Sequence, residues 1–251
     1  MNQASVGFHC PECLKSGRQK VVQGQAAFAG ANSQLYVTKA IIGLNVLVFV
    51  LTLNTNGGLG LKFSALQDWS TFGPLIDLDG SWWRLITGGF LHSGPLHIGM
   101  NMYILWVLGK SVELSLGPVR YAALYMTALL AGSMGALLAA PEAATVGASG
   151  AVFGLVGALA IAQRAHGRSM WAGGIGSLLL INLVISLTVP NISIGGHVGG
   201  FLGGLAAGWM MYEAPRTTGK KWTDFAGTAG LAAVFLIGGL WAATTWVDPI
   251  F

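Results

Sequence analysis

The sequence has few charged residues. Asp, Glu, Lys and Arg together make up 9% of its 251 residues, whereas 53% are hydrophobic. A soluble domain carries about 25% charged residues, which cover its surface in water. This shortage excludes a water-exposed globular surface and indicates a membrane protein. The 38 glycines agree with that interpretation, because glycine is frequent in membrane helices and lets them approach closely.

The sequence also lacks a concentrated basic patch. Its formal net charge is +4, but the basic residues are dispersed over short loops. We therefore interpret them as signals of membrane topology and expect no nucleic-acid partner. No cleavable signal peptide is visible, because the first apolar run starts near Lys39, after about forty mostly polar residues.

Cysteine is nearly absent, with only Cys10 and Cys13, in the segment His9-Cys10-Pro11-Glu12-Cys13. Cys-x-x-Cys is half of a zinc knuckle, and a structural zinc site needs four ligands. His9 is adjacent to Cys10, which would strain its use as a third ligand. Two interpretations stay open. The cysteines are free cytosolic thiols or a degenerate knuckle, or they belong to a metal site completed by another chain or by residues preceding this start. We expect no required cofactor.

Apolar runs separated by prolines and polar loops predict seven transmembrane helices. The runs cover residues 40–53, 95–116, 119–140, 148–165, 171–189, 195–212 and 225–247, and the prolines are Pro118, Pro141, Pro190 and Pro215. We therefore expect an all-α polytopic bundle. The long loop 54–90 contains aromatic, amphipathic pieces at 63–69 and 81–85, which are typical of helices lying in the membrane interface.

The positions of the basic residues test this count. If the N-terminal tail is cytosolic, only Lys62 and Arg84 of the 13 lysines and arginines fall on the outer side. Positive charge concentrates in cytosolic loops, so this split favours seven spans with the N-terminus inside and the C-terminus outside the cell membrane. We divide the chain into a cytosolic tail (1–37), a six-helix core (38–213) and a linker with the seventh helix (214–251).

Four polar side chains fall at the outer ends of three spans that are far apart in the sequence. They are His97, Asn101, Ser149 and His197. Taken singly they are weak signals, because serine is a routine packing residue in membranes and a polar pair often bonds neighbouring helices. His197 is the strongest, since an ionisable residue within a span is by default a functional hypothesis. Together they predict a serine nucleophile with a histidine base, and further donors for an oxyanion.

The distribution of acids limits the kind of catalytic site. None of the nine Asp and Glu residues falls in the apolar runs 148–165 or 195–212. A buried acid completing a Ser-His-Asp triad is therefore not expected, and a Ser-His dyad is the simpler hypothesis. The Gly-x-Ser-x-Gly elbow of soluble esterases is also absent, because residue 151 is Ala151. No H-E-x-x-H metal motif or nucleotide-binding loop is present.

Glycines at a spacing of four residues run along the sixth span. They are Gly196, Gly200, Gly204 and Gly208, and the fourth span supplies Gly150 and Gly154. Such stripes are typical of close helix contact. A dyad requires that contact, because only then does Ser149 come within hydrogen-bond reach of His197.

These residues resemble the motifs of the rhomboid family of intramembrane serine proteases. The matches are Gly147-Ala148-Ser149-Gly150 (G-x-S-G), Gly196-His197-Val198-Gly199-Gly200 with Gly204 (H-x-x-G-x-x-x-G), and His97-Ile98-Gly99-Met100-Asn101 (H-x-x-x-N). Trp83-Arg84 is similar to the W-R pair of the family's first loop, and Gly109 with Glu113 to its turn after the second span. The resemblance covers roughly residues 38–212.

The resemblance implies a role for each matched residue. Ser149 would be the nucleophile and His197 the general base, and His97, Asn101 and the Ser149 backbone N–H would stabilise the oxyanion. Trp83 and Arg84 would shape the first loop, and His92 would be loop structure. Some relatives have Tyr where this chain has Phe153, whose ring could still pack on the histidine. Some bacterial relatives carry a longer cysteine-rich segment ending in Cys-Pro-Glu-Cys, of which only the end is present here.

The implied function is cleavage of transmembrane protein substrates in the lipid bilayer. Two alternatives belong to other classes. A non-catalytic rhomboid relative that binds membrane clients would lack the serine or the histidine, and this chain keeps both. Inverted repeats and acids inside spans are typical of a transporter. The sequence shows no repeat, and no acid lies in the middle of a span. No oligomeric state is predicted.

Overall fold

The computed structural model describes residues 2–3, 8–9, 35–54, 59–169, 171, 174–189, 192–220 and 222–247. The chain divides into two units, Met1–Gln34 and Leu35–Phe251. In the first unit, β1 (Asn2–Gln3) pairs with β2 (Phe8–His9) in antiparallel fashion. Cys10 and Cys13 lie outside the described residues, so the metal-site hypothesis stays a prediction.

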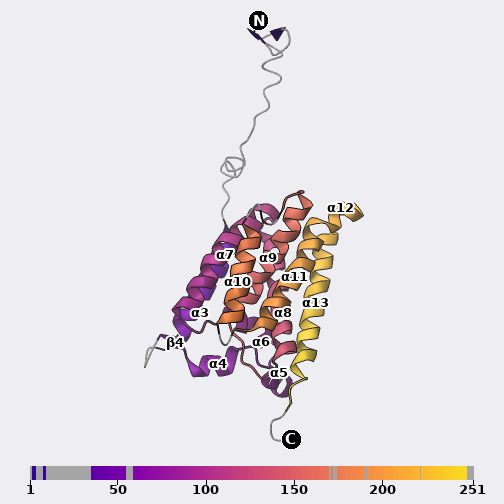
Figure 1. The fold of residues 1–251 in the computed structure, drawn as a ribbon. Helices are drawn as coiled ribbons and strands as arrows, with labels where there is room; N and C mark the ends of the chain where they lie inside the picture. Colours follow the sequence, from indigo (N-terminus) through magenta and orange to yellow (C-terminus); the bar gives the residue numbers. More distant parts are fainter. Residues whose placement is uncertain are drawn as a thin grey trace. The chain divides into compact units, whose positions relative to one another are not determined.

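The second unit is built on seven helices of 14 to 22 residues within the described part of the chain (Figure 1). They are α3 (Tyr36–Thr52), α7 (Pro95–Leu116), α8 (Pro118–Ala139), α9 (Ser149–Ala165), α10 (Ile175–Thr188), α11 (Ile194–Tyr212) and α13 (Thr223–Ala243). The predicted all-α fold is confirmed, and each helix overlaps one predicted apolar run.

Length and hydropathy alone mark fewer helices as membrane spans. Among the described residues, α8 and α13 are long and apolar enough to cross a bilayer, and α3, α9 and α10 are shorter apolar helices. Two of the described helices thus have the length and composition of a membrane span, and the count of seven spans stays a prediction.

Short elements fill the loop between α3 and α7. They are a two-stranded hairpin of β3 (Leu53–Asn54) and β4 (Gly60–Leu61), then α4 (Phe63–Trp69), α5 (Gly73–Asp79), α6 (Arg84–Thr87) and the 3₁₀ turn η1 (Gly88–Phe90). The amphipathic piece predicted at 63–69 coincides with α4. Helices α4, α5 and α6 gather at one end of the bundle, and α12 (Ala214–Thr218) lies at the other (Figure 1).

Glycines bring α11 into direct backbone contact with α9. A methyl group added to Gly200 would overlap the carbonyl oxygen of Gly150, and one on Gly204 would overlap that of Gly154. Both faces of this contact are therefore main chain, as the glycine stripe predicts.

Helix α8 approaches a neighbouring face of α11 in the same way. A methyl group on Gly135 would overlap the carbonyl oxygen of Gly195 and lie 2.8 Å from the Gly199 Cα atom. One on Gly132 would lie 3.1 Å from the Gly150 Cα atom and 3.2 Å from the Gly196 carbonyl oxygen. Three helices thus converge beside the positions of Ser149 and His197.

Helix α3 begins four residues before the apolar run that predicted it, at Tyr36. The cause is Glu113 on α7, whose carboxylate accepts hydrogen bonds from Val37 N and Thr38 N, both at 2.8 Å, and from Thr38 Oγ1 at 2.6 Å. A carboxylate at a helix N-terminus satisfies backbone donors that otherwise lack partners. The turn is polar, so hydropathy does not reveal it.

Helix α13 is fastened to the rest of the unit at both ends. Arg120 Nε on α8 is 2.6 Å from Asp224 Oδ2. At the other end, Trp246 Nε1 donates to Asp77 Oδ2 and Val247 N donates to Glu142 Oε1, each at 3.0 Å. The second group of bonds joins the helix to α5 and to the loop that leads into α9.

Candidate active site

Ser149 is the first residue of α9, directly after a loop with unusual backbone geometry. Gly147 has a φ of 124°, which an L side chain rarely adopts, and its N–H donates to the Gly88 carbonyl at 2.9 Å. The first helical hydrogen bond of α9 runs from Val152 N to Ala148 O at 3.0 Å. The N–H of Ser149 therefore belongs to the first turn, whose donors have no partner within the helix.

The loop before Ser149 is held against the first loop of the unit. Thr71 and Thr145 exchange backbone hydrogen bonds of 3.0 and 2.9 Å. Arg84, which is buried, donates from Nη1 to the Ser70 carbonyl at 3.2 Å, and its own carbonyl accepts from Thr71 Oγ1 at 2.9 Å. Arg84 thus fixes the loop that in turn fixes the approach to Ser149, in keeping with the structural role that the resemblance implies.

His197 lies on α11 and meets Ser149 across the glycine contact. Its Nε2 atom is 2.8 Å from Ser149 Oγ, and the residue is 8% exposed. The N-cap Ser193 accepts a hydrogen bond from Gly196 N at 3.1 Å, which fixes the first turn of α11. The Phe153 ring stacks on the imidazole, with ring centroids 4.2 Å apart and planes 17° apart. The contact that a dyad requires is therefore present.

The second imidazole nitrogen of His197 also has a partner, which the sequence analysis missed. Its Nδ1 atom is 2.7 Å from Ser186 Oγ on α10, and Ser186 Oγ is 2.7 Å from the carbonyl oxygen of Asn182. Ser186 is buried. The sequence offered no distinguishing signal, because one hydroxyl in an apolar run is usually a packing residue.

His97 borders the same small space as Ser149. A methyl group built on Gly147 would lie 2.8 Å from His97 Nε2 and 3.7 Å from Ser149 Oγ. The other ring nitrogen, Nδ1, is 3.0 Å from Ser93 Oγ. The tautomer of His97 that carries its proton on Nε2 can therefore donate a hydrogen bond to a group bound at Ser149.

Asn101 lies one turn after His97 on α7, and its amide bonds the backbone of its own helix. Its Nδ2 atom donates to the His97 carbonyl at 2.9 Å, and the residue is buried. The structure thus brings Ser149, His197 and His97 together, whereas the Asn101 amide is engaged by its own helix.

His92 packs against His97 from the loop before α7. The two rings meet edge to face with centroids 5.0 Å apart, and His92 is fully buried. Burial, assisted by the nearby His97, lowers the pKa of His92 from its usual 6.5 to about 3. His92 is therefore neutral at physiological pH and supports the His97 ring as an uncharged group.

Buried acids within the described residues are engaged elsewhere. Glu113 caps α3, and Asp224 pairs with Arg120. No hydrogen bond or ion pair found in the described part of the chain joins a carboxylate to His197. The described residues also contain no group of three or more His, Cys, Asp or Glu side chains arranged to hold a metal.

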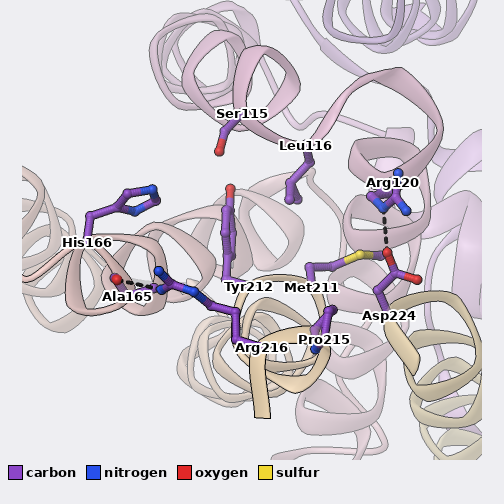
Figure 2. Close-up of a pocket in the computed structure, with 10 residues that line it drawn as sticks. All are labelled: Ser115, Leu116, Arg120, Ala165, His166, Met211, Tyr212, Pro215, Arg216 and Asp224. Carbon is purple, nitrogen blue, oxygen red and sulfur yellow. Dashed lines mark hydrogen bonds and ion pairs between the residues drawn. The ribbon is translucent and has the colours of Figure 1, made fainter. Parts of the chain in front are cut away.

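A cavity of about 440 Å³ lies at the opposite end of α9 (Figure 2). Its wall includes two arginines, and both already have partners. Arg120 pairs with Asp224, and Arg216 Nη1 donates to the Ala165 carbonyl at 2.6 Å. The rise of 1.5 Å per helical residue separates this cavity from Ser149 by about 25 Å. The hydrogen-bonded pair of Ser149 and His197, which has the groups for nucleophilic catalysis, lies at the N-terminal end of α9.

Comparison with known proteins identifies the family. The family model described as "Rhomboid domain" matches residues 79–214. The chain is similar to "Rhomboid protease GluP" of Bacillus subtilis, with 34% identity over 83% of this chain and 41% of the relative. It is also similar to "RHOMBOID-like protein 5" of Arabidopsis thaliana, with 34% identity over 55% of this chain and 47% of the relative.

A fungal relative completes the comparison. "Rhomboid-type serine protease 2" of Emericella nidulans is 30% identical over 56% of this chain and 29% of its own length. The chain thus spans less than half the length of each of these curated relatives. The matched residues 79–214 contain Ser149, His197, His97 and Asn101, and with this match over more than half of its length the chain belongs to the rhomboid family.

Proposed function

We propose that this protein is an intramembrane serine endopeptidase that cleaves transmembrane segments of other membrane proteins. The observation that carries the proposal is the 2.8 Å contact between Ser149 Oγ and His197 Nε2. Relatives named as a rhomboid protease and a rhomboid-type serine protease support the same class of reaction.

In the first half of the reaction, Ser149 is the nucleophile and His197 the general base. His197 Nε2 takes the Ser149 hydroxyl proton while Oγ attacks the carbonyl carbon of the scissile peptide bond. The oxyanion that forms lies near the Ser149 N–H and His97 Nε2–H, which donate hydrogen bonds to it. Asn101 contributes after its amide turns away from the His97 carbonyl.

In the second half, His197 changes from base to acid. The C–N bond breaks and the proton on Nε2 passes to the leaving amine, which leaves an acyl group on Ser149 Oγ. A water molecule then attacks the acyl carbon as His197 takes its proton. That proton returns to Ser149 Oγ when the carboxylic acid product leaves. No cofactor takes part in these steps.

The membrane placement follows from charge and topology. We propose seven spans in the cell membrane, with the tail 1–37 in the cytosol, the six-helix core 38–213, and the linker with seventh helix 214–251 ending outside. In this orientation Ser149 and His197 lie near the outer surface, where water reaches them. The partners are the lipid bilayer and transmembrane substrates. Free thiols or a zinc ligand pair at Cys10 and Cys13 remain alternative hypotheses for the tail.

Covalent labelling tests the proposal directly. A fluorophosphonate probe should label the wild-type protein in detergent at Ser149, as mapped by mass spectrometry. Ser149→Ala should lose labelling, and His197→Ala should lose on the order of 10⁴-fold or more in rate. Ser111→Ala, an exposed serine on α7, is the matched control and should label like the wild type.

Two results would contradict the proposal. Equal labelling of the wild type and Ser149→Ala would remove Ser149 as the nucleophile. A protein that binds helical substrates with small, helix-breaking residues but cleaves none of them would instead be a non-catalytic client-binding relative.

A further inference from the structure

Ser186 is a buried hydroxyl that the reaction above does not use. It lies on α10 and is 4% exposed. Among the described hydrogen bonds, it is the only residue of this helix that bonds His197. We propose that Ser186 is a positioning residue that holds His197 in the tautomer and orientation needed to take the Ser149 proton. The inference rests on the proposed function and adds a positioning residue to the same site.

The proton inventory of Ser186 decides the direction of its bond to His197. A hydroxyl has one proton and two lone pairs. The Asn182 carbonyl, 2.7 Å away, can only accept, so the Ser186 proton points to it. At Nδ1, also 2.7 Å away, the Ser186 oxygen must then accept, and the proton of the imidazole sits on Nδ1.

This arrangement sets the chemistry of the other nitrogen. A neutral imidazole with its proton on Nδ1 has a lone pair on Nε2, and Nε2 faces Ser149 Oγ at 2.8 Å. The opposite tautomer would place a proton between Nε2 and Ser149 and could not act as a base. The bond from Ser186 thus favours the productive tautomer before substrate binds.

Geometry limits the ring in three directions. Ser186 holds one edge of the imidazole, Ser149 meets the other, and Phe153 covers a face at 4.2 Å. The bond to Nδ1 also persists when His197 becomes an imidazolium, because both nitrogens are then donors. Ser186 is neutral, so its effect on rate is smaller than that of a carboxylate in the same place.

Three substitutions separate a positioning role from a packing role. Ser186→Ala removes the acceptor, and Ser186→Cys keeps nearly the same shape with a weaker acceptor. Both should lower kcat and the rate of fluorophosphonate labelling by about 2- to 10-fold, with KM unchanged. Ser186→Thr should stay within about 2-fold of the wild type, because a helical threonine can keep its oxygen on the carbonyl four residues earlier.

A matched control lies on the same helix. Thr188 Oγ1 donates to the Val184 carbonyl at 2.8 Å, is exposed, and has no bond to His197 among those described. Thr188→Val should therefore leave kcat and labelling unchanged. If Ser186→Ala does not fold, the comparison of Ser186→Cys with Ser186→Thr carries the test.

A spectroscopic measurement gives a readout that does not need turnover. The ¹⁵N shifts of the His197 imidazole, assigned by their loss in His197→Gln, should report the Nδ1–H tautomer in the wild type. They should report a mixture of tautomers in Ser186→Ala. A wild-type Nε2–H tautomer would overturn the proposal, whether or not the protein cleaves substrate.

The activity measurements can overturn the proposal separately from the function. Wild-type activity in Ser186→Ala, a change in KM alone, or a Ser186→Thr variant as slow as Ser186→Ala would each remove Ser186 from a positioning role. In all three cases Ser149 would remain the labelled residue. Absence of labelling in the wild type would instead contradict the proposed function, and the tautomer measurement would still decide the role of Ser186.

Discussion

At the scale of single residues, Gly147 has a constrained backbone and leaves no room for a side chain. Its φ is 124°, and a Cβ atom there would lie 2.8 Å from both Cε1 and Nε2 of His97. Gly147→Ala should therefore displace the His97 ring and strain the turn before Ser149, lowering the fluorophosphonate labelling rate by at least about 10-fold. The measurement is the second-order labelling rate in detergent.

A second glycine with positive φ is the control for that substitution. Gly80 has a φ of 64° at the end of α5, and an added Cβ would meet no atom within 4 Å. Gly80→Ala should cost about 1 kcal/mol of stability and leave the labelling rate unchanged. Equal loss of labelling in both variants would mean that backbone strain alone, rather than contact with His97, controls the site.

The proposed roles also set the pH dependence. His197 can take the Ser149 proton only when Nε2 has a free lone pair, so the neutral imidazole is the active form. Protonation blocks the reaction, and kcat/KM should therefore fall as the pH is lowered through the titration of His197. Rates measured between pH 4 and 9 on a stable, folded sample test this. A rate that stays constant throughout, with folding intact, would contradict a histidine base.

The residues of the site differ in how far the sequence could predict them. Ser149 and His197 lie in glycine-flanked motifs, and the predicted topology assigns them the same membrane depth, so their meeting was predictable. Ser186 was not, because its role depends on a 2.7 Å contact between two helices and has no local pattern. Asn101 shows the converse, since a matching motif did not predict that its amide bonds the His97 carbonyl.

At the scale of the helices, the spacing of α9 and α11 depends on glycine. An added methyl group at Gly204 would overlap the Gly154 carbonyl, so Gly204→Ala must push the helices apart. We expect a loss of stability of about 1 to 3 kcal/mol, and a larger loss of labelling because Ser149 and His197 lie on the separated helices. Thermal unfolding and labelling rates on the same sample measure the two effects.

Gly230 on α13 is the matched helical control. A Cβ atom there would meet nothing within 4 Å. Gly230→Ala should be neutral or stabilise the helix by about 0.5 to 1 kcal/mol. If Gly204→Ala behaved in the same way, the two helices would have room to adjust, and close packing would not control the site.

Helix boundaries were predictable where a change in hydropathy marks them. They were not predictable where a polar side chain from another helix caps the end. Helix α7 covers the predicted residues 95–116, because its ends coincide with Pro95 and Gly117. Helix α3 starts earlier than its apolar run because Glu113, 75 residues away from Thr38, caps it. A cap supplied by a distant helix leaves no trace in the local sequence.

At the scale of the whole molecule, α13 is joined to the other helices by a buried acid at its start. Asp224 is 3% exposed and pairs with Arg120, whose side chain is 38% exposed. Arg120→Ala leaves that carboxylate buried without its partner and should destabilise the protein by about 2 kcal/mol, less than for a fully buried pair because Arg120 is partly solvated.

A double-mutant cycle isolates this interaction. Asp224→Asn removes the charge, so Arg120→Ala should cost much less in that background, with a coupling of about 1 kcal/mol. The free energy of unfolding in detergent, measured for the four proteins, gives the coupling. Additive losses would mean that the ion pair contributes nothing and that Arg120 acts through its packing on Phe225, 4.9 Å from the guanidinium carbon.

The main-chain contact between α9 and α11 has a consequence for temperature. Glycine has no side-chain rotamers, so closing these helices on each other loses only backbone conformational entropy. Warming therefore has no side-chain disorder to release between Gly200 and Gly150 or between Gly204 and Gly154. The distance from Ser149 to His197 should then stay constant until the helices separate altogether. Fluorophosphonate labelling should therefore be lost at the same temperature at which the protein unfolds.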